Sequence, residues 1–304
     1  MKQEILTIHS SCDNLPLSVA MIYPEGDVKG IIQLVHGMAE HKERYFPFME
    51  FLAEAGYATI MHDHRGHGDS VKAADDLGYF YDETGTYVVE DVRTVGAYAE
   101  QRFPGAPLYL FGHSMGALIV RVYLKKYDDT IKKLIVCGAP GKNPVVGVAK
   151  MLINVLKTFK GERNRSMLMY NLSLGPFNKT IENPRTPCDW LTVNEANVDA
   201  YLADPKSGFF FTLNGYQNLM CVMEECFKES GWGMKQKDVP IFFIAGSEDP
   251  CISGKKGWEE SMEFLRGRGY SQVNGKLYEG YRHEILNETI FQQVYNDVLQ
   301  FIEA

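Results

Sequence analysis

The chain has 304 residues, of which 45% are hydrophobic and 23% are charged, and its formal net charge is −8. This is the composition of a globular protein, and it excludes a largely disordered chain. The acidic balance and the lack of a basic run argue against a nucleic-acid-binding protein, and the lack of a run of about 18 apolar residues argues against a transmembrane helix.

Strands and helices alternate over the first 140 residues. Short apolar runs such as GIIQLV predict buried strands, and apolar residues at helical spacing predict the helices between them. The predicted strands cover residues 15–23, 30–35, 57–61, 108–111 and 131–137, and the predicted helices cover 44–55, 87–102 and 117–127. This rhythm predicts an α/β fold with a mostly parallel central sheet flanked by helices.

The rhythm breaks after Pro140 and returns at Val239. Between these points no clear buried strand occurs, and residues 145–159 place a set of apolar side chains on one helical face: Val148, Met151, Leu152, Val155 and Phe159. The last section predicts strands at 239–245 and 272–278 and helices at 255–266 and 284–302. We therefore expect a core formed by residues 1–140 and 239–304, with a mainly helical lid inserted at 141–238.

One pentapeptide carries a specific chemical signal. Residues 112–116, GHSMG, fit the pattern G-x-S-x-G, in which a serine nucleophile sits on a tight turn between a strand and a helix. The apolar run LYLF leads into the motif and a helical pattern leads out of it, as the turn requires. The following helix also directs its N-terminus at the site, which favours a developing negative charge. Ser114 is the candidate nucleophile.

A serine nucleophile needs a base to take its proton and a carboxylate to orient that base. In folds that carry this turn, the three residues follow one another along the chain in the order serine, acid, histidine. Asp249 follows the predicted strand at 239–245, where loops of parallel sheets carry function, and Glu248 is the neighbouring alternative. His283 follows the last predicted strand and is the only histidine beyond His113. The sequence thus favours Asp249 as the acid and His283 as the base.

The tetrahedral intermediate of such a reaction carries an oxyanion that needs two preplaced N–H donors. The residue after the nucleophile, Met115, supplies one backbone N–H. The loop after the strand at 30–35 supplies the other, and its position indicates the backbone N–H of Met38.

A rival reading concerns a cluster of histidines. His62, His64 and His67 resemble part of a metal-binding H-x-H-x-D-H motif, but Gly66 stands where that motif has aspartate, and few later histidines remain as ligands. The alternative is a tight loop in which Asp63 and Arg65 brace the edge of the sheet. The triad itself needs neither a metal nor a cofactor, and we predict neither.

The cysteines are dispersed and form no CxxC pair: Cys12, Cys137, Cys188, Cys221, Cys226 and Cys251. This pattern indicates reduced thiols. Because the N-terminus also lacks the apolar stretch of a signal peptide, we expect a cytoplasmic protein.

Several segments together resemble a known family. HGMAEHKERY, DHRGHGDS, GHSMGA, GSEDP and YRHE are similar to motifs of the α/β-hydrolases grouped as monoacylglycerol lipase and lysophospholipase-like enzymes, also called serine aminopeptidase-like. The motifs span residues 35–284. The resemblance implies Ser114 as nucleophile, Asp249 as acid, His283 as base, Met38 and Met115 as oxyanion donors, and a lid after the strand ending at Cys137.

Three functions compete on this basis. The leading hypothesis is hydrolysis of a monoacylglycerol or lysophospholipid-type ester, with apolar lid residues lining an acyl tunnel and the lid transiently touching a membrane surface; a short-chain carboxylesterase is the close alternative. A proline-preferring aminopeptidase would need acidic residues for the substrate's amino group, and Glu195, Glu224 and Glu225 are candidates. A non-catalytic binding protein is disfavoured, because all three triad residues are present.

Overall fold

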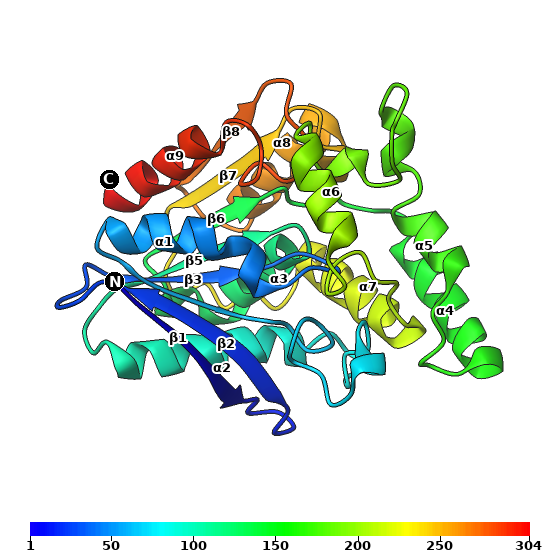
Figure 1. Ribbon diagram of the computed structural model, residues 1–304, viewed down its shortest axis with the longest axis horizontal. Coiled ribbons are helices and arrows are strands. Elements are labelled where there is room, and N and C mark those ends of the chain that lie inside the picture. The colour runs from blue at the N-terminus through cyan, green and yellow to red at the C-terminus, as the bar shows by residue number, and fades with distance from the viewer.

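The computed structural model describes residues 1–304 and contains one eight-stranded sheet (Figure 1). The strands are β1 (Lys2–His9), β2 (Pro16–Tyr23), β3 (Ile31–Val35), β4 (Ala58–His62), β5 (Leu108–His113), β6 (Lys133–Cys137), β7 (Ile241–Gly246) and β8 (Val273–Tyr278). Their order is β1-β2-β4-β3-β5-β6-β7-β8, and only β2 runs against the others. The predicted mostly parallel α/β sheet is confirmed.

Helices cover both faces of this sheet. On one face, α1 (Phe46–Glu54) and α9 (Phe291–Glu303) share a core in which Phe48 contacts Tyr295. On the other face lie α2 (Tyr87–Arg102), α3 (Met115–Tyr127) and α8 (Gly254–Gly267). Every residue of β3 and β4 is buried, as expected for strands covered on both sides.

The chain between β6 and β7, residues 138–240, leaves the sheet and is here called the β6–β7 insertion. It contains α4 (Val146–Lys160), α5 (Met167–Ser173), α6 (Glu195–Ala203) and α7 (Leu213–Phe227). Figure 1 shows α4 and α5 at the side of the molecule opposite the two chain ends. No helix in the structure has the length and apolar character needed to cross a bilayer.

The predicted helix at 145–159 is α4, but most of its apolar face points to solvent. Val148 and Met151 are each 64% exposed and Phe159 is 83% exposed, whereas Ile153 on another face is fully buried. The helix packs against α7 through that other face.

Two further differences have local causes. The final helix begins at Phe291 rather than at residue 284, because Glu284 and Glu288 bond to the β6–β7 insertion instead of opening a helix. Strand β1 was not predicted from the sequence. It is an edge strand with mostly exposed side chains, so its sequence lacks the apolar run of a buried strand.

Candidate active site

Ser114 lies on the sharp turn between β5 and α3. Its φ is +55°, a conformation that costs a serine about 1–3 kcal/mol. The turn is tight because the chains approach closely: a Cβ on Gly112 would lie 2.5 Å from the carbonyl oxygen of Gly116, and one on Gly116 would lie 2.1 Å from that of Val35. Both glycines of the motif are therefore required by the geometry that exposes Ser114.

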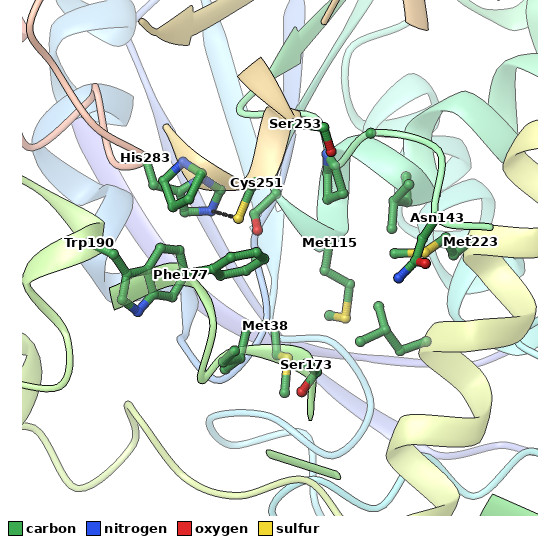
Figure 2. Close-up of a pocket in the computed structure, with 18 of the residues that line it drawn as sticks. Met38, Met115, Asn143, Ser173, Phe177, Trp190, Met223, Cys251, Ser253 and His283 are labelled. Carbon is green, nitrogen blue, oxygen red and sulfur yellow. Dashed lines mark hydrogen bonds between the residues drawn. The ribbon is translucent and has the colours of Figure 1, made fainter. Parts of the chain in front are cut away.

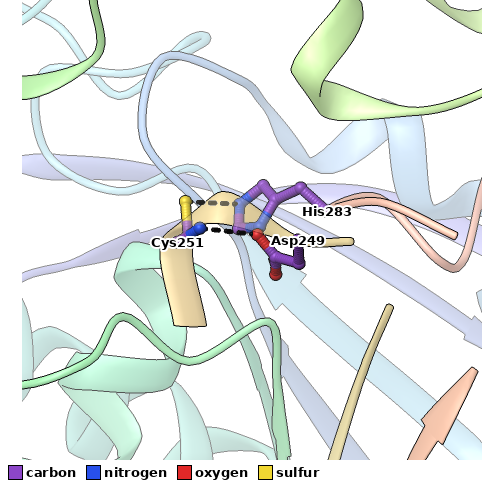
Figure 3. Close-up of side chains that lie close together, drawn as sticks. All are labelled: Asp249, Cys251 and His283. Carbon is purple, nitrogen blue, oxygen red and sulfur yellow. Dashed lines mark hydrogen bonds and ion pairs between the residues drawn. The ribbon is translucent and has the colours of Figure 1, made fainter. Parts of the chain in front are cut away.

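Asp249 and His283 lie side by side on the loops after β7 and β8 (Figure 3). The Nδ1–H of His283 donates to Oδ2 of Asp249 at 2.9 Å, and the backbone N–H of Cys251 donates to Oδ1 of Asp249 at 2.8 Å. Both side chains are buried. Burial lowers the pKa of His283, but the charge and hydrogen bond of Asp249 outweigh burial and raise the pKa above its ordinary value of 6.5.

The other ring nitrogen of His283 faces the cavity that Ser114 also lines. Its Nε2 lies 3.9 Å from Sγ of Cys251 (Figure 2), and no hydrogen bond joins it to Ser114. Catalytic hydrogen bonds are often long before substrate binds. The ring is held between two others, with its centroid 4.7 Å from that of His113 and 5.1 Å from that of Trp190. These contacts fix the orientation of the imidazole.

The loop after β3 carries Met38 along the wall of the same cavity, which Met115 also lines. A Cβ on Gly37 would lie 3.1 Å from Cβ of Ser114, so the backbone passes close to the candidate nucleophile. The N–H of Gly37 donates to Oε1 of Glu40 at 2.6 Å, which anchors the start of this loop. Met38 and Ser114 therefore line one cavity, and the oxyanion role of the Met38 N–H stays a prediction.

Glu40 belongs to a buried charge network. Arg44 donates to Oε2 of Glu40 at 2.8 Å and to both carboxylate oxygens of Glu284 at 2.8 and 2.7 Å. Burial raises the pKa of Glu40, but the hydrogen bond with His113 and the charge of Arg44 outweigh it and hold the pKa well below the ordinary value. The loops of Ser114, Met38 and His283 are therefore tied to one another by ionised groups.

The cavity beside Ser114 has a volume of about 350 Å³. Figure 2 shows Trp190, Phe177 and His283 on one side of it, and Met223 and Asn143 on the other. Apolar side chains from α3, α5 and α7 form much of the wall: Met115, Leu118, Leu172, Leu219, Met220 and Met223. Glu40, Tyr201 and Glu284 give the cavity a polar part. The cavity can hold an apolar chain next to a group with hydroxyls.

The acidic residues predicted for an aminopeptidase do not line this cavity. Glu195 is exposed, Glu224 pairs with Lys150 at 2.5 Å, and Glu225 pairs with Lys125 at 2.5 Å. The carboxylates that do line the cavity, Glu40 and Glu284, are both paired with Arg44. Sequence reasoning missed Tyr201 and Trp190, which the β6–β7 insertion brings to the cavity and which no local motif marks.

Metal-ligating atoms gather at one place, where Asp249, Cys251 and His283 each offer an atom within 4.8 Å of the others (Figure 3). These groups already bond to one another, and burial and Asp249 raise the pKa of the Cys251 thiol well above its ordinary value, which disfavours the thiolate. These three groups are therefore better arranged to orient the imidazole of His283 than to bind a cation.

The histidine cluster contacts His36, the residue that follows β3, through His64. Nε2 of His64 donates to the carbonyl of His36 at 3.1 Å and Nδ1 of His67 to that of Arg65 at 3.1 Å, so the rings face separate backbone groups rather than one metal position. Arg65 bonds to Asp91 at 2.7 Å, and Asp63 accepts from Lys42 at 2.7 Å. The bracing role expected for Asp63 and Arg65 matches these contacts.

The buried histidines predict a loss of stability in acid. Burial lowers the pKa of His62 to about 3 and that of His67 to about 4, against 6.5 in the unfolded chain. Below pH 6.5 the unfolded state binds protons that the folded state does not, so the free energy of unfolding decreases as the pH is lowered. The slope approaches about 1.4 kcal/mol per pH unit for each histidine.

Urea unfolding at pH 7 and pH 5 measures this slope. Neither ring nitrogen of His62 has a hydrogen-bond partner, so His62→Leu removes the titration without breaking a hydrogen bond. We expect the variant to lose less stability than the parent between the two pH values. Equal losses of stability in the variant and the parent would contradict the lowered pKa of His62.

The chain is similar to several known proteins. Residues 26–290 match the family described as "Serine aminopeptidase, S33". The chain is 28% identical to the monoacylglycerol lipase of Mycolicibacterium smegmatis, over 92% of this chain and 90% of that protein. It is 31% identical to the probable lysophospholipase L2 of Haemophilus influenzae, over 88% and 81%. A thermostable carboxyl esterase from Bacillus coagulans, solved with glycerol, superposes with a TM-score of 0.92 at 27% identity, over 100% of this chain and 98% of that one.

Proposed function

The chain belongs to the serine aminopeptidase S33 family of α/β-hydrolases and is a carboxylic ester hydrolase, and we propose that it cleaves a single-chain lipid ester with a Ser114–His283–Asp249 triad. Monoacylglycerols and lysophospholipids are the substrate classes that the names of its relatives suggest. The observation that carries the proposal is the cavity itself, in which Ser114 and His283 lie beside an apolar wall and a smaller polar part.

The proposed reaction follows from the positions of these groups. Oγ of Ser114 attacks the ester carbonyl carbon while Nε2 of His283 takes its proton, and Asp249 holds the imidazole in the required tautomer. The backbone N–H groups of Met38 and Met115 stabilise the oxyanion. Collapse of the intermediate releases the alcohol, which receives the proton from His283. Water then attacks the acyl-enzyme by the same route and releases the fatty acid.

We assign the two parts of the substrate to the two parts of the cavity. The wall formed by α7, with Leu219, Met220 and Met223, suits the acyl chain, because flexible methionines accept apolar groups of different shapes. Glu40 and Glu284 offer hydrogen-bonding groups to the hydroxyls of the leaving alcohol. This assignment favours a long acyl chain over a short one.

Initial rates on glycerol monoesters with acyl chains of increasing length test this assignment. We expect kcat/KM to rise beyond the four-carbon ester. A collapse of activity beyond four carbons would instead identify a short-chain carboxylesterase. Release of naphthylamine from prolyl-β-naphthylamide would identify the aminopeptidase alternative, for which the cavity offers no unpaired carboxylate.

We further propose that residues 141–238 form a lid whose outer surface touches lipid. The exposed apolar side chains of α4 and α5 supply this surface: Val148, Met151, Val155, Phe159, Met167 and Leu168. Lys160, which is exposed at the end of α4, suits the polar headgroup region.

Replacing Phe159 by aspartate should weaken action at a lipid surface. Full burial of a phenylalanine contributes about 1.5–3 kcal/mol, so we expect a loss of activity of roughly 10- to 150-fold on phospholipid vesicles carrying a long-chain monoacylglycerol. Hydrolysis of a water-soluble ester should not change. Ile5→Asp makes the same replacement at an exposed residue of β1 and serves as the control. Equal losses in both variants would contradict the lid contact.

A further inference from the structure

Two donors from the β6–β7 insertion hold the carbonyl oxygen of Ala39. The hydroxyl of Tyr201 on α6 donates to it at 3.1 Å, and the backbone N–H of Gly208 donates to it at 2.9 Å. Ala39 has a φ of +53°, a left-handed conformation that an alanine adopts only when its surroundings impose it. The insertion thus supplies the hydrogen bonds that stabilise this strained residue.

Ala39 directly follows Met38, the proposed oxyanion donor. On the other side of Met38, the N–H of Gly37 is anchored to Glu40 at 2.6 Å. The carbonyl of Gly37, which shares a peptide plane with the N–H of Met38, accepts from Nδ1 of His36 at 2.8 Å. Met38 therefore lies between one anchor formed within its own loop and a second anchor supplied by the insertion. The direction of its own N–H depends on both anchors, since a rotation of either peptide plane turns the residue between them.

From these contacts, and on the premise of the proposed function, we infer that Tyr201 is a positioning residue for the oxyanion hole. Its hydroxyl holds Ala39 in the left-handed conformation that directs the N–H of Met38 at the reacting carbonyl. A segment of the proposed lid thereby completes the catalytic machinery of the core.

Other contacts of α6 support this role. Tyr201 is 8% exposed, and the guanidinium carbon of Arg44 lies over its ring, 4.9 Å from the ring centre. Asp204, just after α6, pairs with His41 at 2.5 Å, so the helix end is also tied to the chain that follows Ala39. Within α6, Asn197 donates to Glu284 at 2.6 Å. The helix and the Met38 loop are therefore joined at several points, and the hydroxyl of Tyr201 has a fixed position relative to Ala39.

Tyr201 also lines the cavity, so its hydroxyl has an alternative role as a contact for the leaving alcohol. Two esters with the same acyl chain, one of glycerol and one of p-nitrophenol, separate the roles in Tyr201→Phe. A positioning role acts on the oxyanion, which both esters form. A contact with glycerol hydroxyls acts on the glycerol ester alone.

We expect Tyr201→Phe to lower kcat about tenfold on both esters with little change in KM, less than the 10²–10³ of losing a whole oxyanion donor. The affinity for an alkyl boronic acid, whose tetrahedral adduct places an oxygen in the oxyanion hole, should fall by a similar factor. Tyr270→Phe is the matched control, because Tyr270 is also buried and its hydroxyl donates to Asp128, away from the cavity.

The inference is overturned if kcat of Tyr201→Phe is unchanged, if the loss is confined to the glycerol ester, or if Tyr270→Phe shows the same loss. Turnover by the parent enzyme tests the proposed function separately. An active parent with an unaffected Tyr201→Phe variant would therefore contradict only the positioning role.

Discussion

Replacement of Ser114 by alanine is expected to lower kcat on a long-chain ester by roughly 10⁴- to 10⁶-fold, because the acyl-enzyme then has no oxygen on which to form. Binding of substrate should persist, since the apolar wall of the cavity is unchanged. Steady-state kinetics on a p-nitrophenyl ester, with thermal unfolding as a check of the fold, measures both effects.

Ser253→Ala is the matched control for this variant. Ser253 lines the same cavity and also has a positive φ, of +59° against +55° for Ser114. It should keep its activity. If Ser114→Ala retained activity within about tenfold of the parent, the hydrolysis would have to proceed without an acyl-enzyme on Ser114.

Replacement of Asp249 by asparagine is expected to lower kcat about 10⁴-fold, because an amide no longer holds His283 in the tautomer that accepts the serine proton. Glu248→Gln makes the same chemical change one residue earlier. Glu248 is exposed and its side chain bonds to no other group, so this variant should be as active as the parent. Loss of activity in Glu248→Gln with a functional Asp249→Asn would reverse the assignment of the acid.

The pH profiles of the same two variants carry an independent signature. His283 must be neutral to act as a base, so kcat/KM rises with pH through its pKa, which the charge of Asp249 raises above 6.5. In Asp249→Asn this charge is gone while the burial of His283 remains. The acid limb of the kcat/KM profile should therefore move to lower pH, and the maximum of kcat/KM should fall. A limb at the same pH would mean that the charge of Asp249 does not raise the pKa of His283.

The parts of this site that could be predicted from the sequence are those set by local chain geometry. The strand, the two glycines and the helix around Ser114 form one continuous segment, and the loops that carry Asp249 and His283 each follow a recognisable strand. Parallel strands end at one edge of a sheet, so the triad candidates could be expected to meet there.

The remaining parts depend on contacts between distant segments. Tyr201 reaches Ala39 across 162 positions of the chain, and Arg44 reaches Glu284 across 240. No spacing or periodicity encodes such pairs. The outward orientation of α4 could not be predicted for the same reason, because an apolar helical face is usually buried and only the packing against α7 shows which face of α4 is covered.

The most direct test of the central claim is peptide mass mapping of the protein after reaction with a fluorophosphonate, followed by an assay of the labelled sample. We predict one covalent adduct, on Ser114, formed in step with the loss of ester hydrolysis and absent in Ser114→Ala. An adduct on another side chain such as that of Cys251, or hydrolysis that persists when Ser114 is fully labelled, would contradict a serine hydrolase built on the Ser114–His283–Asp249 triad.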